Sequence, residues 1–111
     1  MQLVKSNEGN VYEAAKHFGC WGIKKVTSEQ GASNVIVSIS EFLPSGGAEL
    51  TSSEKERVYC VLRGSITLTD GSNEEYVLEE NDMIYIAPGE KRAIKVNGTV
   101  AARLLVIIVN A

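Results

Sequence analysis

The stretch RVYCVLRGSITLTDGSNEEYVL, residues 57–78, consists of short runs of β-branched, aromatic and aliphatic residues with turn residues between them. RVYCVL (57–62) and SITLTD (65–70) are separated by Arg63-Gly64, and Asp70-Gly71 lies between SITLT and EEYVL. Asp-Gly is a strong hairpin signal, because both central positions of the tight turn favour positive φ. The stretch therefore predicts short strands that follow one another closely.

The same pattern continues on both sides of this stretch. NVIVSISEFL (34–43) is rich in β-branched residues, and Asn97-Gly98 predicts a second hairpin between RAIKV and TVAARLLVIIV. Short strands with turn dipeptides between them indicate an all-β sandwich or barrel. The helical candidate VYEAAKHF (11–18) is about two turns long, which is marginal for a helix. We therefore expect a turn or an arm there, leading into a strand at Trp21 to Val26.

Length and composition limit the class of protein. The 111 residues fit one domain, and a hydrophobic content of 44% is enough for a core. The net charge is −3 and the basic residues are scattered, so we expect no nucleic-acid partner. No apolar run approaches the roughly 18 residues of a membrane span, so we expect a cytoplasmic protein with no membrane partner. Cys20 and Cys60 lie far apart and are expected to be reduced thiols.

Two segments, ERVYCVLRGSITL (56–68) and ENDMIYIAPGEKRAI (80–94), resemble the two motifs of the cupin superfamily. Cupins are small β-barrels that enclose a ligand cavity. The resemblance implies an all-β, cupin-type double-stranded β-helix, or jelly-roll, barrel. It also implies a single cupin domain over residues 1–111, in which a core (41–109) follows an N-terminal arm and the first strands (1–30).

The resemblance fails at each metal-ligand position. Counting back from Gly64, the ligating glutamate of the family falls at Arg57, and its two histidines fall at Thr51 and Ser53. The histidine of the second motif falls at Arg92. A guanidinium keeps its proton in proteins and cannot ligate a metal. We therefore expect neither a bound metal nor another cofactor.

Strand alternation predicts which side chains share the cavity. If Arg57 has the inward orientation that the family implies, Tyr59 faces inward too, because side chains alternate along a strand. By the same alternation Thr51 and Ser53 share a face with Glu49, and Arg92 shares one with Ile94 and Val96. The predicted substrate-binding residues are Thr51, Ser53, Arg57 and Arg92, with Tyr59 beside them and Glu49 at the rim of the cavity.

The two arginines have more than one interpretation. Arg57 and Arg92 could clamp a carboxylate or phosphate, since the planar guanidinium offers two parallel donors. They could instead be surface residues paired with Glu54 or Glu56. An internal ion pair between Arg57 and Glu49 that fills the barrel is a third interpretation.

His17 and Tyr59 are the candidate catalytic residues. His17 is the single histidine of the chain, and imidazole is the side chain that ordinarily changes charge near neutral pH. A tyrosine hydroxyl can donate a proton or a hydrogen bond. The alternatives are a structural role for His17, which lies outside the motifs, and a core position for Tyr59.

These observations predict a metal-independent protein that binds a small anionic organic molecule, such as a carboxylate, in its barrel. It would be a cofactor-free isomerase, lyase or hydrolase if the arginines stabilise an oxyanion or enolate and His17 or a tyrosine moves a proton. The alternative is a non-catalytic binding or regulatory module for the same sort of ligand. LLVIIV (104–109) is apolar on both faces, as is typical of a strand covered on both sides, so we also expect a homodimer.

Overall fold

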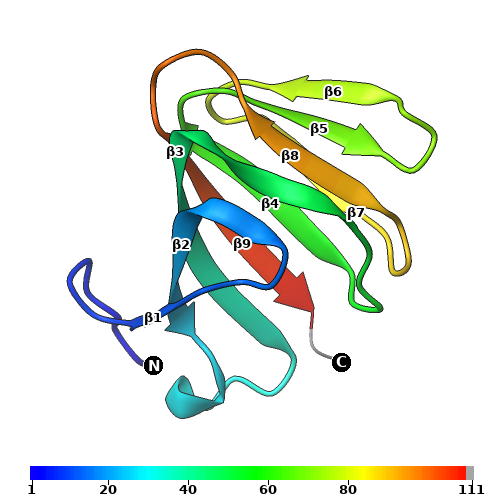
Figure 1. The fold of residues 1–111 in the computed structure, drawn as a ribbon. Helices are drawn as coiled ribbons and strands as arrows, with labels where there is room; N and C mark the ends of the chain where they lie inside the picture. Colours follow the sequence, from blue (N-terminus) through cyan, green and yellow to red (C-terminus); the bar gives the residue numbers. More distant parts are fainter. Residues whose placement is uncertain (110–111) are drawn as a thin grey trace.

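In the computed structural model, residues 1–109 are described and fold into a nearly closed β-barrel (Figure 1). The prediction of an all-β barrel is confirmed. Within the described residues there is no helix long and apolar enough to cross a membrane. The elements are β1 (Asn10–Tyr12), β2 (His17–Val26), the short 3-10 turn η1 (Ser28–Gln30), β3 (Val35–Thr51), β4 (Arg57–Arg63), β5 (Ile66–Asp70), β6 (Glu75–Leu78), β7 (Met83–Ile86), β8 (Arg92–Val96) and β9 (Ala102–Val109).

The long strand β3 organises the sheet. Its first half pairs with β9, its second half pairs with β8, and β2 runs antiparallel along much of its length. The strand order is β6-β5-β8-β3-β9-β4-β7, with β1 and β2 added beside β3. Strands β6 and β7 end this order without pairing to each other, and we call the place between them the seam. Figure 1 shows the β5–β6 hairpin at one end of the molecule and β1 at the other.

The bend in β3 depends on two glycines. A Cβ atom on Gly46 would lie 2.3 Å from the carbonyl oxygen of Gly19, and one on Gly47 would lie 2.3 Å from that of Ile94. Any side chain at either position would therefore collide with backbone. Because Gly46 and Gly47 have no side chains, β3 can continue to Thr51, beyond the strand at 34–43 that the β-branched residues predict.

The N-terminal segment forms no helix, as expected. Strand β1 ends at Tyr12 and β2 begins at His17, with Lys16 in the left-handed region at φ 59°. The strand therefore begins at His17 rather than at Trp21. This difference matters for the site, because His17 becomes part of the sheet and lies opposite Ala48 of β3.

The hairpin predicted at Asp70-Gly71 is present, with a longer turn than expected. Strands β5 and β6 pair antiparallel, and the positive φ falls on Asn73 rather than on Gly71. The Oδ1 atom of Asp70 accepts hydrogen bonds from the backbone N–H groups of Ser72 (2.8 Å) and Glu74 (3.0 Å). The carboxylate of Asp70 therefore organises the turn.

The hairpin predicted at Asn97-Gly98 is wrong. Strand β8 pairs with the second half of β3 and with β5, whereas β9 pairs with the first half of β3 and with β4, so β8 and β9 do not pair with each other. Asn97 ties this crossing to β5: its side chain accepts a hydrogen bond from Thr67 (2.9 Å) and donates one to Ser65 (3.0 Å). A turn dipeptide marks where the chain turns, and does not decide which strands pair.

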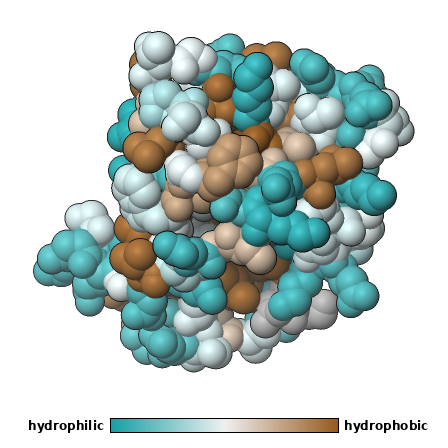
Figure 2. All heavy atoms as spheres, in the orientation of Figure 1, coloured by the Kyte–Doolittle hydropathy of each residue, from teal (hydrophilic) through white to brown (hydrophobic). Residues whose placement is uncertain are grey.

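The core lies inside the barrel, between its two walls. Strand β9 was expected to be covered on both sides, and within this chain only one face is fully buried: Ala102, Leu104 and Val106 are buried, and the residues between them are half-buried. The outer surface is mixed, since the face in Figure 2 carries hydrophobic residues between hydrophilic ones. The largest fully buried side chains are Phe42, Ile66, Leu104 and Val61.

Candidate functional site

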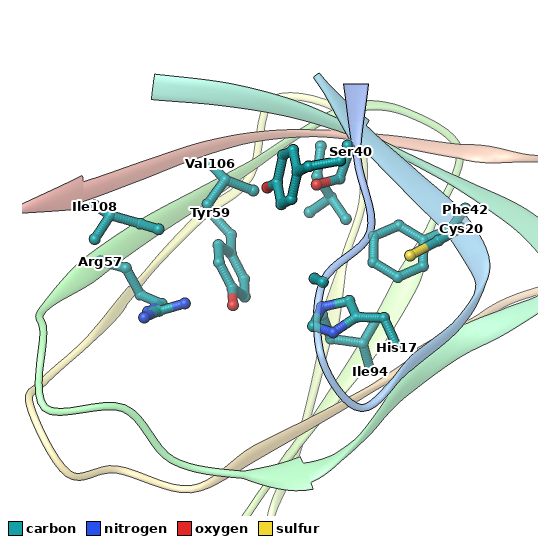
Figure 3. Close-up of a pocket in the computed structure, with 13 residues that line it drawn as sticks. His17, Cys20, Ser40, Phe42, Arg57, Tyr59, Ile94, Val106 and Ile108 are labelled. Atoms are coloured by element: carbon teal, nitrogen blue, oxygen red, sulfur yellow. The ribbon is translucent and has the colours of Figure 1, made fainter. Parts of the chain in front are cut away.

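A pocket of about 140 Å³ opens into the barrel between its N-terminal strands and the β4–β9 wall (Figure 3). Its wall is mostly apolar, with a few polar groups that point into the same space, as is typical of small-molecule sites. We call it the barrel pocket. It is lined by Tyr12, Ala14, His17, Cys20, Gly22, Ser40, Phe42, Arg57, Tyr59, Ile94, Leu104, Val106 and Ile108.

Arg57 supplies the positive charge of the barrel pocket. It is the first residue of β4, opposite Ile86 of β7 and Ile108 of β9, and its Nε atom is buried without a hydrogen-bond partner in the structure. None of the lining residues, all of which lie within the described range 1–109, is Asp or Glu. A buried guanidinium donor without an acceptor is costly, so this geometry favours an anion or another acceptor in the pocket.

Tyr59 lies two residues further along β4, on the same face as Arg57, and is 3% exposed. Its hydroxyl oxygen accepts a hydrogen bond from Nε of Arg92 at 3.3 Å. Because the guanidinium has no acceptor atom, the hydroxyl hydrogen of Tyr59 stays available to another partner. In Figure 3 the Tyr59 hydroxyl and the Arg57 guanidinium point into the same part of the pocket.

His17 reaches the barrel pocket from the start of β2, on the other side from Arg57 (Figure 3). Its Nδ1 atom lies 2.8 Å from the carbonyl oxygen of Ala15. A carbonyl oxygen accepts only, so Nδ1 carries the hydrogen, and in the neutral ring Nε2 then holds a free lone pair. The ring also packs against Phe42, with 6.0 Å between the ring centroids. The contact with Ala15 thus favours the tautomer in which Nε2 can accept a proton.

Cys20 forms part of the apolar wall beside His17. Burial, together with the negative charge of Glu13, raises the pKa of the Cys20 thiol. The thiol is therefore neutral at physiological pH, which argues against a role as a thiolate nucleophile. Cys60 is buried at 6% exposure outside this pocket, so Cys20 is the more accessible of the two free thiols.

Arg92 does not line the barrel pocket. It is 7% exposed, and besides Tyr59 it donates from Nη1 to the carbonyl oxygen of Thr51 at 3.0 Å. Thr51 lies directly opposite Arg92 in the β3–β8 pairing. Arg92 therefore orients the Tyr59 hydroxyl and binds the backbone at the end of β3. It does not form a carboxylate-binding pair with Arg57.

Three further predicted residues also lie outside the pocket. Glu49 is exposed at the end of β3, since the register of β3 against β8 shifts between Ala48 and Thr51. Ser53 follows the strand in a loop, where its Oγ atom accepts a hydrogen bond from the N–H of Lys55 and its carbonyl oxygen accepts one from Gly89. The sequence argument placed Thr51, Ser53 and Glu49 on one regular strand face, and the irregular end of β3 removes that regularity.

The predicted ion-pair alternatives are likewise absent. Among residues 1–109, the arginine–carboxylate pairs join Glu41 to Arg63 (2.6 Å) and to Arg103 (3.1 Å). The carboxylate of Glu56 instead accepts a hydrogen bond from the hydroxyl of Tyr85 at 2.6 Å. Arg57 is therefore paired with none of Glu49, Glu54 and Glu56.

Several residues that line the barrel pocket were not predicted from the sequence, because they lie outside the two cupin motifs. Tyr12 comes from β1, and its ring lies where a Cβ atom on Gly22 would be, 2.5 Å from the nearest ring carbon. Its hydroxyl lies 3.3 Å from Oγ of Ser38. Ser40 and Cys20 come from β3 and β2. No local signal marks these residues, because pairing between distant strands brings them together.

The residues present do not fit the metal that cupins commonly hold. The positions that match the family's ligands carry Thr51, Ser53, Arg57 and Arg92, of which none has an imidazole, thiolate or carboxylate donor. No group of three or more His, Cys, Asp or Glu that could hold a metal ion is present among residues 1–109. These positions therefore do not form a metal site of the family's kind.

Comparison with known proteins identifies the family. The family model of the cupin domain matches residues 38–108. A beta-D-galactosidase of Mycobacterium tuberculosis is 32% identical over 98% of this chain and 93% of its own length. The polyketide cyclase RemF from Streptomyces resistomycificus has a similar structure, with a TM-score of 0.87 and 21% identity over 100% of this chain and 80% of that one. An RmlC-like cupin from Shewanella frigidimarina gives a TM-score of 0.81 and 10% identity over 100% and 92%. The chain belongs to the cupin family.

Proposed function

We propose that this protein binds a small organic carboxylate in the barrel pocket. The observation that carries the proposal is the buried, unpartnered Nε atom of Arg57 in a pocket whose lining residues, all within residues 1–109, include no carboxylate. A bound carboxylate would supply the missing acceptor and the missing negative charge together. Charge-assisted hydrogen bonds of this kind are about twice as strong as neutral ones.

The other polar groups complement the same ligand. The Tyr59 hydroxyl accepts from Arg92 and can donate its own hydrogen to a second ligand oxygen. The volume of about 140 Å³ is below the range of roughly 300–1,000 Å³ that is typical of drug-sized ligands. The pocket therefore favours a small acid.

A catalytic role would use His17. With Nδ1 hydrogen bonded to Ala15, Nε2 could remove a proton from the carbon next to a bound carbonyl or carboxylate group. The electron pair of the broken C–H bond would move to the ligand oxygen, where Arg57 and Tyr59 stabilise the developing negative charge. Return of the proton to a different atom of the ligand would make the reaction an isomerisation.

A non-catalytic sensor would need the same complementarity without proton transfer. The apolar wall, formed in part by Cys20, Phe42 and Ile94, serves both functions equally. The catalytic protein and the sensor differ in turnover, which requires His17 as the base. Binding of a carboxylate is common to both.

The binding experiment compares matched acids and amides. Acetate, lactate and pyruvate are titrated against acetamide and lactamide, with isothermal calorimetry as the measurement. Cys20 gives a second measurement, since a ligand in the pocket should slow its alkylation by iodoacetamide at about pH 8.5, while buried Cys60 reacts slowly throughout. Amides that bind as tightly as the acids, or acids that leave the alkylation of Cys20 unchanged, would contradict the proposal.

Hydrolysis of a β-galactoside is a second candidate function, favoured by the 32% identity to the mycobacterial beta-D-galactosidase. Most glycosidases use two carboxylates that are about 5–9.5 Å apart. The lining of the barrel pocket contains no carboxylate, so such a reaction would have to use residues elsewhere. The test is release of nitrophenol from a nitrophenyl β-D-galactoside by the purified protein. Turnover that persists in Arg57→Met would support this candidate, and absence of turnover would contradict it.

A further inference from the structure

A second pocket, of about 160 Å³, lies at the seam between β6 and β7. We call it the seam pocket. It shares no lining residue with the barrel pocket, and the inference drawn from it does not rest on the proposed function. Its floor consists of the apolar side chains of Leu68, Ile84 and Ile86, which are contributed by β5 and β7.

Two tyrosines flank the seam pocket, one from each end strand of the sheet. Tyr76 of β6 is 39% exposed and Tyr85 of β7 is 58% exposed. The Tyr85 hydroxyl donates to Glu56 at 2.6 Å, and the Tyr76 hydroxyl lies 3.3 Å from Oδ2 of Asp70. The two rings therefore stand on opposite sides of the pocket, where either face can pack on a ring-shaped ligand.

The charged residues that line the seam pocket balance, and the two further carboxylates nearby, those of Glu74 and Glu56, accept hydrogen bonds from the tyrosine hydroxyls. Asp70 and Glu90 contribute negative charges, and Lys91 and Arg92 contribute positive ones. A ligand with a net charge would therefore gain from one pair and lose to the other. An uncharged ligand with many hydroxyl groups can use both, since hydroxyls donate to carboxylates and accept from ammonium and guanidinium groups.

The carboxylates keep free acceptor positions. Asp70 uses its oxygens for Ser72, Glu74 and Tyr76, which occupies three of about four lone-pair positions. In Glu90, Oε2 accepts from the N–H of Ala87 at 2.8 Å, and Oε1 has no hydrogen-bond partner within the described part of the chain. Each carboxylate can thus accept from a ligand hydroxyl without giving up its structural bonds.

We propose that the seam pocket binds an uncharged polyhydroxylated ring, of the size of one monosaccharide. The apolar C–H face of such a ring would cover the isoleucine floor and pack on Tyr76, while its hydroxyls would reach Asp70, Glu90 and the two cations. The volume of about 160 Å³ is close to that of the barrel pocket, so the seam pocket admits one small ring and no larger glycan.

Isoleucine methyl groups provide separate probes for the two pockets. Ile84 and Ile86 line the seam pocket, whereas Ile94 and Ile108 line the barrel pocket. The experiment is an NMR titration of isoleucine-methyl-labelled protein with the methyl glycosides of glucose, galactose and mannose. We expect at least one glycoside to shift the Ile84 and Ile86 signals in a saturable way and to leave Ile94 and Ile108 unchanged.

Two variants test the contacts. Glu90→Gln keeps an oxygen for the N–H of Ala87 but removes the charged acceptor, and Tyr76→Leu removes the aromatic wall. Each should weaken glycoside binding about two- to tenfold. Arg57→Met, which changes the barrel pocket alone, should leave the glycoside affinity unchanged. The Glu90 variant keeps the test valid if Tyr76→Leu folds poorly.

Three outcomes would overturn this inference. The first is no saturable shift at Ile84 and Ile86 with any of the glycosides. The second is a shift confined to Ile94 and Ile108, which would place the sugar in the barrel pocket. The third is a stronger shift at Ile84 with acetate or methylammonium than with every glycoside, which would mean that the seam pocket selects a charged ligand.

Discussion

Arg92 of β8 donates a hydrogen bond from Nε to the hydroxyl oxygen of Tyr59 of β4, at 3.3 Å across the barrel interior. Tyr59 lines the barrel pocket and Arg92 lines the seam pocket, so this contact joins the walls of the two. It also orients the phenol, since an oxygen that accepts from Arg92 directs its own hydrogen elsewhere. Arg92 is therefore a positioning residue for the barrel pocket.

Replacing Arg57 by Met should weaken carboxylate binding by roughly 1.5–3 kcal/mol, about tenfold to a hundredfold, because one charge-assisted contact is lost. The stability of the fold should stay the same or rise, since an unpaired buried guanidinium group is removed. Calorimetric titration with lactate and thermal unfolding measure the two effects. Arg63→Met is the matched control, because Arg63 is exposed and lies outside the pocket. Unchanged carboxylate affinity in Arg57→Met would disprove the role of this arginine.

Replacing Arg92 by Met should lower the stability of the fold more than the carboxylate affinity, which is the reverse of the effect expected for Arg57→Met. The carbonyl oxygen of Thr51 and the hydroxyl of Tyr59 lose a buried donor, which costs about 1–3 kcal/mol. We expect a fall of several degrees in Tm and a smaller loss of carboxylate affinity than in Arg57→Met. A variant that is more stable than the wild type and binds carboxylate as poorly as Arg57→Met would show that Arg92 contacts the ligand directly.

Replacing His17 by Asn tests for proton transfer. The Asn amide can still donate to the carbonyl oxygen of Ala15, but it lacks the Nε2 lone pair. In deuterium oxide, a catalytic protein should exchange the proton next to the carboxylate of a bound ligand, and His17→Asn should lose this exchange at least about a hundredfold. Binding affinity should change little. Equal exchange rates in both proteins would exclude His17 as the base, and no exchange in either would favour a sensor.

Asp70 should make the stability of the fold depend on pH. The backbone N–H groups of Ser72 and Glu74, together with the Tyr76 hydroxyl, hold the pKa of Asp70 below its usual value. Because the folded pKa is depressed, the contribution of Asp70 is present above the unfolded value of about 3.9 and is lost as the pH falls through the folded value. Asp70→Asn keeps an acceptor oxygen without the charge. Urea unfolding should show the wild type to be more stable at pH 7, with a difference that narrows below about pH 4. A difference that is constant over this range would contradict the assignment.

We propose that the outward face of the sheet forms a homodimer. Ile39 of β3, Leu105 of β9 and Cys60 of β4 lie side by side in the strand pairing, and Val37, Ile107 and Val58 form the next row. Light scattering should give about twice the chain mass of 12.0 kDa. Ile107→Lys should yield a monomer, whereas Val100→Lys, in the exposed loop before β9, should not change the mass. A monomeric wild type at micromolar concentration would contradict this proposal.

Local pattern was sufficient to predict most of the strands. Alternation and turn residues indicated the hairpin of β5 and β6 and the all-β barrel. Local pattern failed where two distant segments decide the structure. The extension of β3 to Thr51 requires the backbone of Gly46 to approach Gly19 closely. Strands β8 and β9 are neighbours in the sequence, but they pair with different halves of β3 and not with each other.

The residues of the candidate site likewise include some that local sequence predicts and some that depend on the pairing of distant strands. Arg57 and Tyr59 share a face because they are two residues apart on one strand, which the sequence alone indicates. His17 reaches the same pocket because β2 pairs with β3 and places His17 opposite Ala48. Cys20 could not be placed in the pocket in advance, since its partner in the strand pairing, Phe42, is distant in the sequence.

The course of β3 has a consequence for how the chain folds. This single strand takes its partners from the N-terminal strand β2, from β8 and from the C-terminal strand β9. Neither wall of the barrel can therefore form before contacts between distant parts of the chain are made, and loop-closure entropy opposes those contacts. Refolding should be slow for a chain of this length, on a scale of milliseconds to seconds. In a truncated chain that ends before β9, the edges of β3 and β4 that pair with β9 would expose unpaired backbone N–H and C=O groups. Such edges pair readily with the strands of other molecules.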